Sequence, residues 1–370
     1  MSFVFVGLGF MAFLSATTLA IDVGMFMTAR SQAQNAADAG ALAGAVALVY
    51  NNFTDRSAGS PAVQGAINAA RANPVVAQPV SIGPADVTFP NDPAGQPTRV
   101  QTQVFRTTER SNPVPTLMGG FFGVRTVDIT ATATAEASPA NAETCVKPFM
   151  IPDKWTERQT PAWDPGDTFD MYDNKGELIA NPDVYVPADQ PGYTGYDADR
   201  DKGMLLTIRA GTGNNISPTM YYSWKMPGDI GGDFYRNNIA TCNTAVVHWH
   251  DLITQEPGNM VGPTNQGIDD LIARDPGAYW DTGCNCVKGS GYGVSPRVVP
   301  IPLYDPVYYA TGKANGRNAD FKVANWLGFF VVGRSGNNVS GRITPVSGVF
   351  DGNAGPAPAG VFPKVIRLVQ

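Results

Sequence analysis

The first fifty residues carry one uninterrupted helical pattern, and this feature limits the chain more than any other. No charged side chain occurs before Asp22, and no proline occurs before Pro61. Because alanine favours helices and proline interrupts them, the alanine-rich run from Ala29 to Ala47 continues the helix begun by the apolar residues. We expect one helix over residues 2–49, about 70 Å long at a rise of roughly 1.5 Å per residue. Such a helix needs a membrane, a bundle of its own copies, or both.

The two halves of this predicted helix differ in their side chains. The first half is apolar enough to span a bilayer, which takes about 20 apolar residues. Its candidate assembly and packing side chains are Phe3, Phe5, Leu8, Phe10 and Leu14. The second half carries small residues at spacings that allow helices to approach closely; they are Ala33, Ala37, Gly40, Ala41, Gly44 and Ala45. These form either a seam between the subunits of a filament or a face that packs on the globular body of the same chain.

The N-terminal helix has two further features that bear on its role. Asp22 is the only acid within the apolar half, and an unpaired carboxylate is costly in lipid. It either marks the membrane–water boundary, which we favour, or holds register within an assembly. No Lys or Arg precedes the apolar run, and no A-x-A cleavage site follows it, unlike a secretory signal. We expect that a short basic leader has been removed; the alternative is an uncleaved signal anchor that starts at its initiator, Met1.

Composition indicates an exported protein with a β-rich body. The chain has 370 residues, with 40 Gly and 30 Pro, so turns are frequent. Its net charge is −6 and it has no cluster of Lys or Arg, which argues against a nucleic-acid partner. The four cysteines are Cys145, Cys242, Cys284 and Cys286. An even number of cysteines behind an apolar N-terminus is typical of disulfides formed outside the cytoplasm, with reduced buried thiols as the alternative.

The pattern beyond the helix predicts an α+β fold in three parts. They are the helix at 1–50, a small α+β domain at 51–140, and a β-rich, outward-facing, disulfide-tied domain at 141–370. In the small domain we expect helices at 61–73 and 115–122 and strands at 85–89, 99–107 and 125–135, from their alternating polarity. In the last domain we expect strands at 205–209, 219–224, 244–248, 297–302, 321–332 and 341–350. One helix is expected there at 264–274, with Thr264 as its N-cap.

Two motifs in the C-terminal part have candidate roles. Because only Asn285 separates Cys284 from Cys286, a bridge between them would close a small ring. We therefore expect Cys145 and Cys242 each to pair with one of them, and a C-x-C metal site is the alternative. The acidic run Asp197, Asp199 and Asp201 resembles the start of a calcium loop but lacks the later Glu, so solvated turns are favoured over calcium. No other cofactor is indicated.

The string from Ala20 to Leu48, AIDVGMFMTARSQAQNAADAGALAGAVAL, resembles the N-terminal signature of the TadE/TadG-like proteins of the Flp, or Tad, pilus-assembly system. That family's pattern is an apolar helix, then Asp-x-Gly, a basic residue and Gln, then Ala-Ala-Asp-Ala and Ala-Leu-Ala-Gly-Ala. The resemblance implies a pilin-like component of the type IV pilus superfamily. Such components are anchored in the cytoplasmic membrane or incorporated into surface filaments, and they are not enzymes.

Two departures limit what the resemblance implies. Pilins of the type IV superfamily usually carry Glu at the fifth position of the mature helix, where this chain has Phe5. Some TadG-type proteins have a metal-binding Asp-x-Ser-x-Ser motif, which does not occur here. For catalysis, the chain has no G-x-S-x-G, no P-loop and no haem-attachment motif, so we expect no enzymatic activity.

These observations favour a structural protein. We expect a pilin-like subunit that lies in the cytoplasmic membrane before assembly and then joins a helical, homo-oligomeric filament at the cell surface, in contact with other pilus-assembly components. The alternative is a membrane-anchored accessory component of the Tad machinery whose exported domain binds a partner or a surface. A secreted enzyme tethered by its helix is a third class, and it would need a paired-carboxylate or metal cleft.

Overall fold

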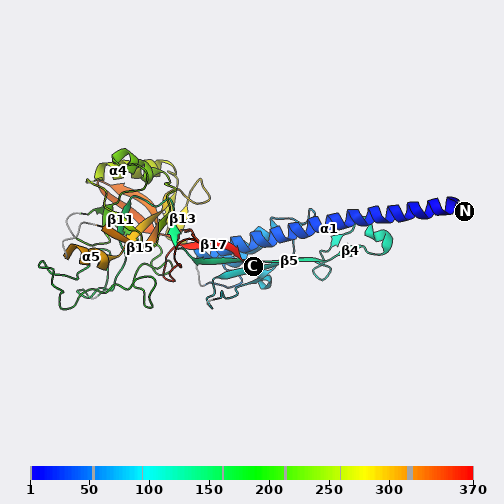
Figure 1. Cartoon of the computed structure of the whole chain (residues 1–370), viewed down its shortest axis with the longest axis horizontal. Helices are drawn as coiled ribbons and strands as arrows, with labels where there is room; N and C mark the ends of the chain where they lie inside the picture. The colour runs from blue at the N-terminus through cyan, green and yellow to red at the C-terminus, as the bar shows by residue number, and fades with distance from the viewer. Residues whose placement is uncertain are drawn as a thin grey trace. The chain divides into compact units, whose positions relative to one another are not determined.

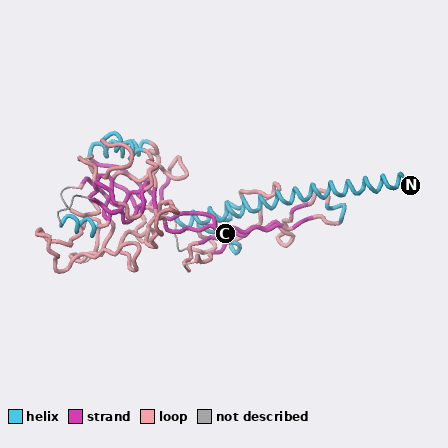
Figure 2. The backbone as a smooth tube through the Cα atoms, in the orientation of Figure 1, coloured by secondary structure: helices cyan, strands magenta, loops and turns pink. Residues whose placement is uncertain are grey.

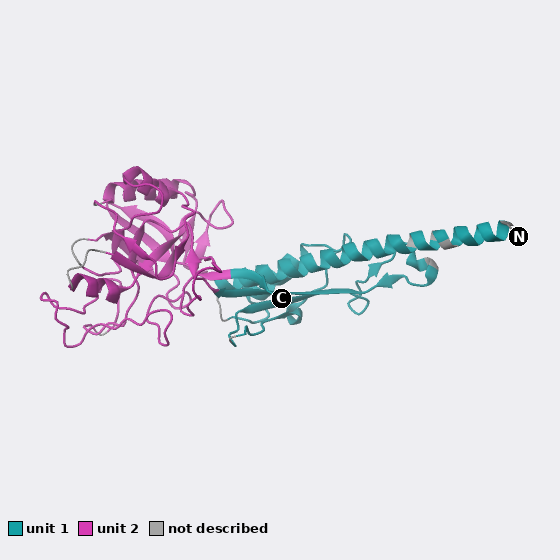
Figure 3. Ribbon diagram, viewed as in Figure 1, with its two compact units in different colours: residues 1–138, 366–370 teal, residues 139–365 magenta. Residues whose placement is uncertain are grey.

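The computed structural model describes residues 2–51, 55–93, 95–160, 162–211, 215–258, 260–314 and 320–369. It divides into two compact units (Figure 3): unit 1 comprises Met1–Ser138 with Ile366–Gln370, and unit 2 comprises Pro139–Val365. The fold is α+β, with a long N-terminal helix followed by mixed helices and strands and then a disulfide-bonded, β-rich part. This class is the one that the sequence predicts. The division into domains at 1–50, 51–140 and 141–370 stays a prediction.

Unit 1 is a long helix with a small sheet beside its C-terminal half (Figure 1). Helix α1 spans Ser2–Tyr50 and confirms the predicted single helix. Helix α2, Pro61–Arg71, begins where Ser60 Oγ accepts a hydrogen bond from the Val63 amide. The sheet has the order β1-β2-β5-β17. Its strands are β1 (Val87–Thr88), β2 (Arg99–Arg106), β5 (Ile129–Pro139) and β17 (Lys364–Val369).

The core of unit 1 follows from the patterns of α1 and β2. Burial alternates along β2, so Val100 and Val104 face inward, as period-two patterning requires. The small residues of α1 pack on α2 and on these valines, and Ala66 of α2 is fully buried between them. Two short strands, β3 (Val114–Pro115) and β4 (Thr126–Val127), pair antiparallel on either side of the 3-10 turn η2, Gly119–Phe122.

Unit 2 contains a closed ring of strands, visible as the cluster of strands in Figure 2. The ring order is β14-β7-β9-β8-β16-β15, and it closes because β15 pairs with both β14 and β16. The pairs β7–β14 and β8–β9 are parallel and the others antiparallel. The strands are β7 (Phe149–Pro152), β8 (Leu205–Ala210), β9 (Met220–Ser223), β14 (Val298–Tyr304), β15 (Asp320–Ser335) and β16 (Asn338–Ile343).

Three helices and several short strands complete unit 2. The helices are α3 (Gly232–Ala240), α4 (Val261–Ala273) and α5 (Pro306–Ala314). The short strands are β6 (Ala142–Glu143), β10 (Val247–His248), β11 (Leu252–Thr254), β12 (Tyr279–Asp281) and β13 (Cys286–Lys288). The sequence predicted only α4, because α3 and α5 span only two to three turns and have weak periodicity.

The predicted start of α4 is wrong. The helix begins at Val261 with Met260 at the N-cap position. Thr264 lies inside the first turn, where its hydroxyl donates to the Met260 carbonyl oxygen at 2.7 Å. A threonine hydroxyl serves equally well at an N-cap or bonded back to a carbonyl one turn earlier, so residue type alone did not fix the helix start.

The predicted disulfide pairing is also wrong. The bridges are Cys145–Cys242 and Cys284–Cys286. Asn285 adopts a left-handed φ of 52°, a conformation that Asn tolerates better than most residues. The two flanking Cα atoms therefore lie 5.2 Å apart, within the range of about 4.4–6.8 Å that bridges use. A tight turn between β12 and β13 thus accommodates the small ring.

The two bridges should differ in their effect on stability. Cys145 and Cys242 are separated by 97 positions, whereas Cys284 and Cys286 are separated by 2. Loop-closure entropy predicts that losing the first bridge costs about 3 kcal/mol more than losing the second. We expect a larger drop in the free energy of unfolding for the double variant Cys145→Ser/Cys242→Ser than for the control Cys284→Ser/Cys286→Ser. Urea unfolding followed by tryptophan fluorescence measures both, since all six tryptophans lie in unit 2. Equal losses would contradict the loop-length argument.

Candidate functional site

The apolar half of α1 is uncovered by the rest of the described chain. Phe3 is 93% exposed, Phe5 72%, and Leu8 and Phe10 about 60%. Leu14 lies in the same helix, but its side chain is outside the described residues. The segment is long and apolar enough to cross a membrane, and none of its most apolar stretch of 18 residues is buried. Exposed apolar surface of this extent requires lipid or another protein to cover it.

The small residues in the second half of α1 have the opposite environment. Ala33, Ala37, Gly40, Ala41, Gly44 and Ala45 are all buried. A Cβ atom on Gly44 would lie 2.8 Å from Val100 Cγ1, and one on Gly40 would lie 3.1 Å from the Ala66 carbonyl oxygen. These positions are small because α2 and β2 approach α1 closely. Of the two alternatives that the sequence left open, packing within the chain is the one that the structure displays.

Asp22 lies at the boundary between the exposed and the buried half of α1, and its side chain is only 5% exposed. Its Oδ1 accepts hydrogen bonds from the backbone amides of Leu117 and Met118 at 2.9 and 3.1 Å, and Oδ2 accepts from Met118 at 3.2 Å. The carboxylate therefore ties the loop after β3 to the helix. Sequence analysis missed this loop as a partner of Asp22; the available signal was the uncharged run Leu117–Val124.

The calcium prediction finds no support in the described residues. Asp201 is buried and its carboxylate bonds to two cations, Lys154 and Arg200, each at 2.8 Å. Asp197 Oδ1 instead accepts the backbone amides of Asp199 and Arg200. No group of three His, Cys, Asp or Glu side chains in the part of the chain that the structure describes is placed to hold a metal. The acidic run therefore forms an ion-paired turn.

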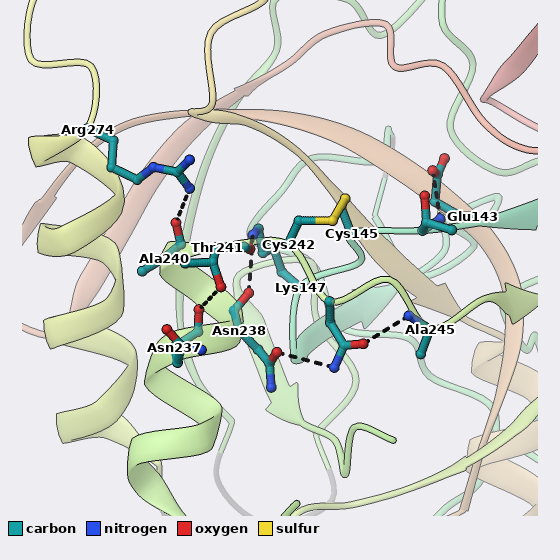
Figure 4. Close-up of a disulfide and its surroundings, with 12 residues drawn as sticks. Glu143, Cys145, Lys147, Asn237, Asn238, Ala240, Thr241, Cys242, Ala245 and Arg274 are labelled. Atoms are coloured by element: carbon teal, nitrogen blue, oxygen red, sulfur yellow. Dashed lines mark hydrogen bonds between the residues drawn. A yellow bond between two sulfur atoms is a disulfide. The ribbon is translucent and has the colours of Figure 1, made fainter. Parts of the chain in front are cut away.

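Unit 2 holds two buried ionisable groups close to the Cys145–Cys242 bridge (Figure 4). Lys147 Nζ donates to the carbonyl oxygens of Asn238 and Thr241, and burial lowers its pKa to about 7. Burial raises the pKa of Glu143 to about 8. Glu143 Oε1 accepts the Thr144 amide at 3.0 Å, while Oε2 is buried with no hydrogen-bond partner among the described groups. Both side chains are buried in the interior of unit 2, each with 3% of its surface exposed.

Each unit also has a surface hollow. In unit 1, a cavity of about 440 Å³ lies between α1 and the start of β5, and it is lined by Val23, Phe26, Met27, Arg30, Val127, Asp128, Ile129 and Thr130. In unit 2, a cavity of about 420 Å³ lies against the β12–β13 hairpin. There the Trp280 and Phe330 rings pack 6.1 Å apart, and the Arg342 guanidinium lies 6.0 Å from the Trp280 ring. This second hollow combines aromatic surface with a cation.

Comparison with known families bears on α1. The family model described as "Putative Flp pilus-assembly TadE/G-like" matches residues 2–47. The N-terminal segment of the chain is therefore similar to that family. The match covers α1 almost completely and ends before α2. No curated protein and no solved structure matches the chain. At the level of the family, the description of the model associates the matched helix with assembly of the Flp pilus.

Asp22 offers a direct test of the contact between α1 and the loop. Replacing it by Leu removes the acceptor of two backbone amides, a loss of about 1–3 kcal/mol when such groups are left unpaired. In Asp22→Leu we expect hydrogen exchange at the Leu117 and Met118 amides to be at least about tenfold faster, since roughly 1.4 kcal/mol corresponds to a factor of ten. Amides of α2 serve as the internal control. Unchanged exchange at both loop amides would show that the carboxylate does not hold the loop.

The raised pKa of Glu143 predicts how the stability of the protein changes with pH. The folded protein keeps its proton up to about pH 8, whereas the carboxyl has a reference pKa of 4.5. Its contribution to stability is therefore full below about pH 4.5 and is lost as pH rises toward 8. The variant Glu143→Gln has no carboxyl to ionise at this position and so does not lose this stability. Its free energy of unfolding, relative to that of the unmodified protein, should therefore increase with pH, by at most about 1.4 kcal/mol per pH unit. Urea unfolding at several pH values measures it, and Glu109→Gln is the exposed control. A difference independent of pH would refute the prediction.

Proposed function

We propose that this TadE/G-like protein is a pilin-like structural subunit. Helix α1 anchors it in the cytoplasmic membrane, with unit 2 exported, and the same helix then packs among its copies in a Tad-type surface filament. The observation that carries the proposal is the uncovered apolar half of α1, together with the family match over that helix. Burying a Phe or Leu side chain contributes roughly 1.5–3 kcal/mol. The row of exposed apolar residues from Phe3 to Ile21 therefore supplies strong cohesion in lipid or among helices.

The hollow on unit 1 supports packing between copies. Met27 is 67% exposed and lines this hollow with Val23 and Phe26. It lies more than one turn beyond Asp22 and lines the hollow together with Arg30 and Asp128, so we place it outside the hydrocarbon core in the anchored state. A helix of a second subunit would bury these side chains. The small residues of α1 do not take part in this contact, because α2 and β2 already cover them.

The accessory alternative is favoured by the hollow on unit 2. Its aromatic side chains and Arg342 form a surface on which a partner with an apolar or anionic group binds. In this alternative the protein stays in the membrane as a minor component, and its exported unit contacts a partner or a surface.

Cell fractionation separates the two proposals. We expect the unmodified protein both in the membrane and in filaments sheared from the cell surface. Met27→Lys places a charge in the hollow, so it should abolish recovery in the sheared fraction. It should leave the membrane fraction intact, because a lysine just beyond the membrane-spanning run reaches the aqueous interface.

The matched control is Asn68→Lys, which adds the same charge on the exposed face of α2 and should assemble normally. Recovery of the unmodified protein from the membrane alone would favour the accessory alternative. Normal assembly of Met27→Lys would show that the hollow is not part of the interface between subunits.

A further inference from the structure

The loop Leu117–Val124, which we call the apolar loop, is unusual for a connection between two strands. Its eight residues contain no charged or hydrogen-bonding side chain. Leu117 is 63% exposed, Phe122 61% and Val124 50%. Loops that face water are generally polar, so this one needs another covering surface.

The apolar loop is held in one conformation by its own contacts. Thr116 Oγ1 donates to the Val124 carbonyl oxygen at 2.8 Å, and the Val124 amide donates to the Gly119 carbonyl oxygen at 3.0 Å. Gly123, with a φ of 83°, ends the η2 turn. The exposed side chains are therefore presented by a closed hairpin whose base is the β3–β4 pair.

Asp22 fixes the level of this loop along α1. Its carboxylate binds the Leu117 and Met118 amides directly, and Figure 1 shows the loop beside the N-terminal half of the helix. Phe3–Ile21, the run that precedes Asp22, is about 28 Å long as a helix, close to the roughly 30 Å of a bilayer's hydrocarbon core. The apolar loop thus lies where the membrane-spanning run ends.

The charges around the loop fit a lipid headgroup region. Arg125 follows the loop directly and is exposed, and Arg30 is exposed two turns beyond Asp22 on α1. Basic side chains next to an apolar surface favour anionic headgroups. The neighbouring acid, Asp128, accepts hydrogen bonds from the Thr108 amide and hydroxyl, and Asp22 is covered by the loop itself.

We propose that the apolar loop inserts Leu117, Phe122 and Val124 into the membrane interface, as a second membrane contact beside α1. This inference rests on the proposed anchoring of α1. The partner is an anionic lipid surface, and its contact with the loop is continuous with the apolar surface of the helix. With two contacts, unit 1 is held in a defined orientation on the bilayer, because one helix alone leaves it free to rotate about the helix axis.

Spin labels on single introduced cysteines test the proposal. The four native cysteines are paired, so only the new thiol reacts. The full chain is reconstituted at high lipid-to-protein ratio in vesicles of phosphatidylcholine and phosphatidylglycerol. Labels at Phe122→Cys and, independently, Val124→Cys should be accessible to oxygen, which concentrates in lipid, and shielded from a water-soluble nickel chelate.

Two reference sites make the outcomes distinguishable. Phe10→Cys lies within the apolar run and reports whether α1 is inserted. Asn68→Cys is exposed on α2, beside Gly40 and about 27 Å beyond Asp22 along the helix, and should be open to the chelate. The oxygen-to-nickel accessibility ratio at Phe122→Cys and Val124→Cys should be several-fold that of Asn68→Cys.

Chelate accessibility at both loop sites with Phe10→Cys shielded would overturn the loop proposal and leave the anchor standing. If Phe10→Cys is also open to the chelate, the proposed anchoring fails as well. Loop labels that are shielded from both reagents, or that show spin–spin broadening, would mean contact with a second copy of the chain and would likewise overturn lipid as the partner.

Discussion

The requirement that helix α1 be covered along its whole length governs the structure. Its second half is covered from within the chain, where small residues allow α2 and β2 to pack closely and Gly44 leaves no room for a Cβ atom beside Val100. Its first half has no cover of this kind, and the described side chains between Phe3 and Ile21 remain exposed. Asp22 lies at the boundary between the two halves, and its carboxylate accepts hydrogen bonds from two loop amides. The proposed membrane attachment and assembly both rest on this division of one helix.

Unit 2 is stabilised differently, by the pairing of its strands and by a disulfide. Its strands close into a ring, so β15 has neighbours on both edges and exposes little unpaired backbone. The Cys145–Cys242 bridge links distant parts of the sequence beside the buried Lys147. These features stabilise unit 2, and the accessory alternative rests on its aromatic hollow at the β12–β13 hairpin.

Sequence reasoning was reliable where the signal is local and repeated. The 49-residue helix follows from an unbroken run without proline, and β2 and β5 follow from alternating residues. It was unreliable where one residue type has several uses. Thr264 resembles an N-cap but bonds within α4. Asp201, for which a turn was favoured over a calcium loop, pairs with Lys154 and Arg200. The ring closure of unit 2 and the return of β17 to the sheet of unit 1 depend on pairings distant in sequence.

The existence of α1, the apolar environment that its first half requires, and the resemblance to pilus-assembly proteins all follow from the order of the amino acids. The first two depend on helix propensity and hydrophobicity, which act residue by residue. The partner of each group, by contrast, is set by the three-dimensional fold. The fold paired Cys284 with Cys286, because a left-handed Asn285 brings them together. It also buried the small residues of α1 within the chain and placed the apolar loop at Asp22. Partners depend on where distant segments meet in space, and composition and periodicity do not contain that information.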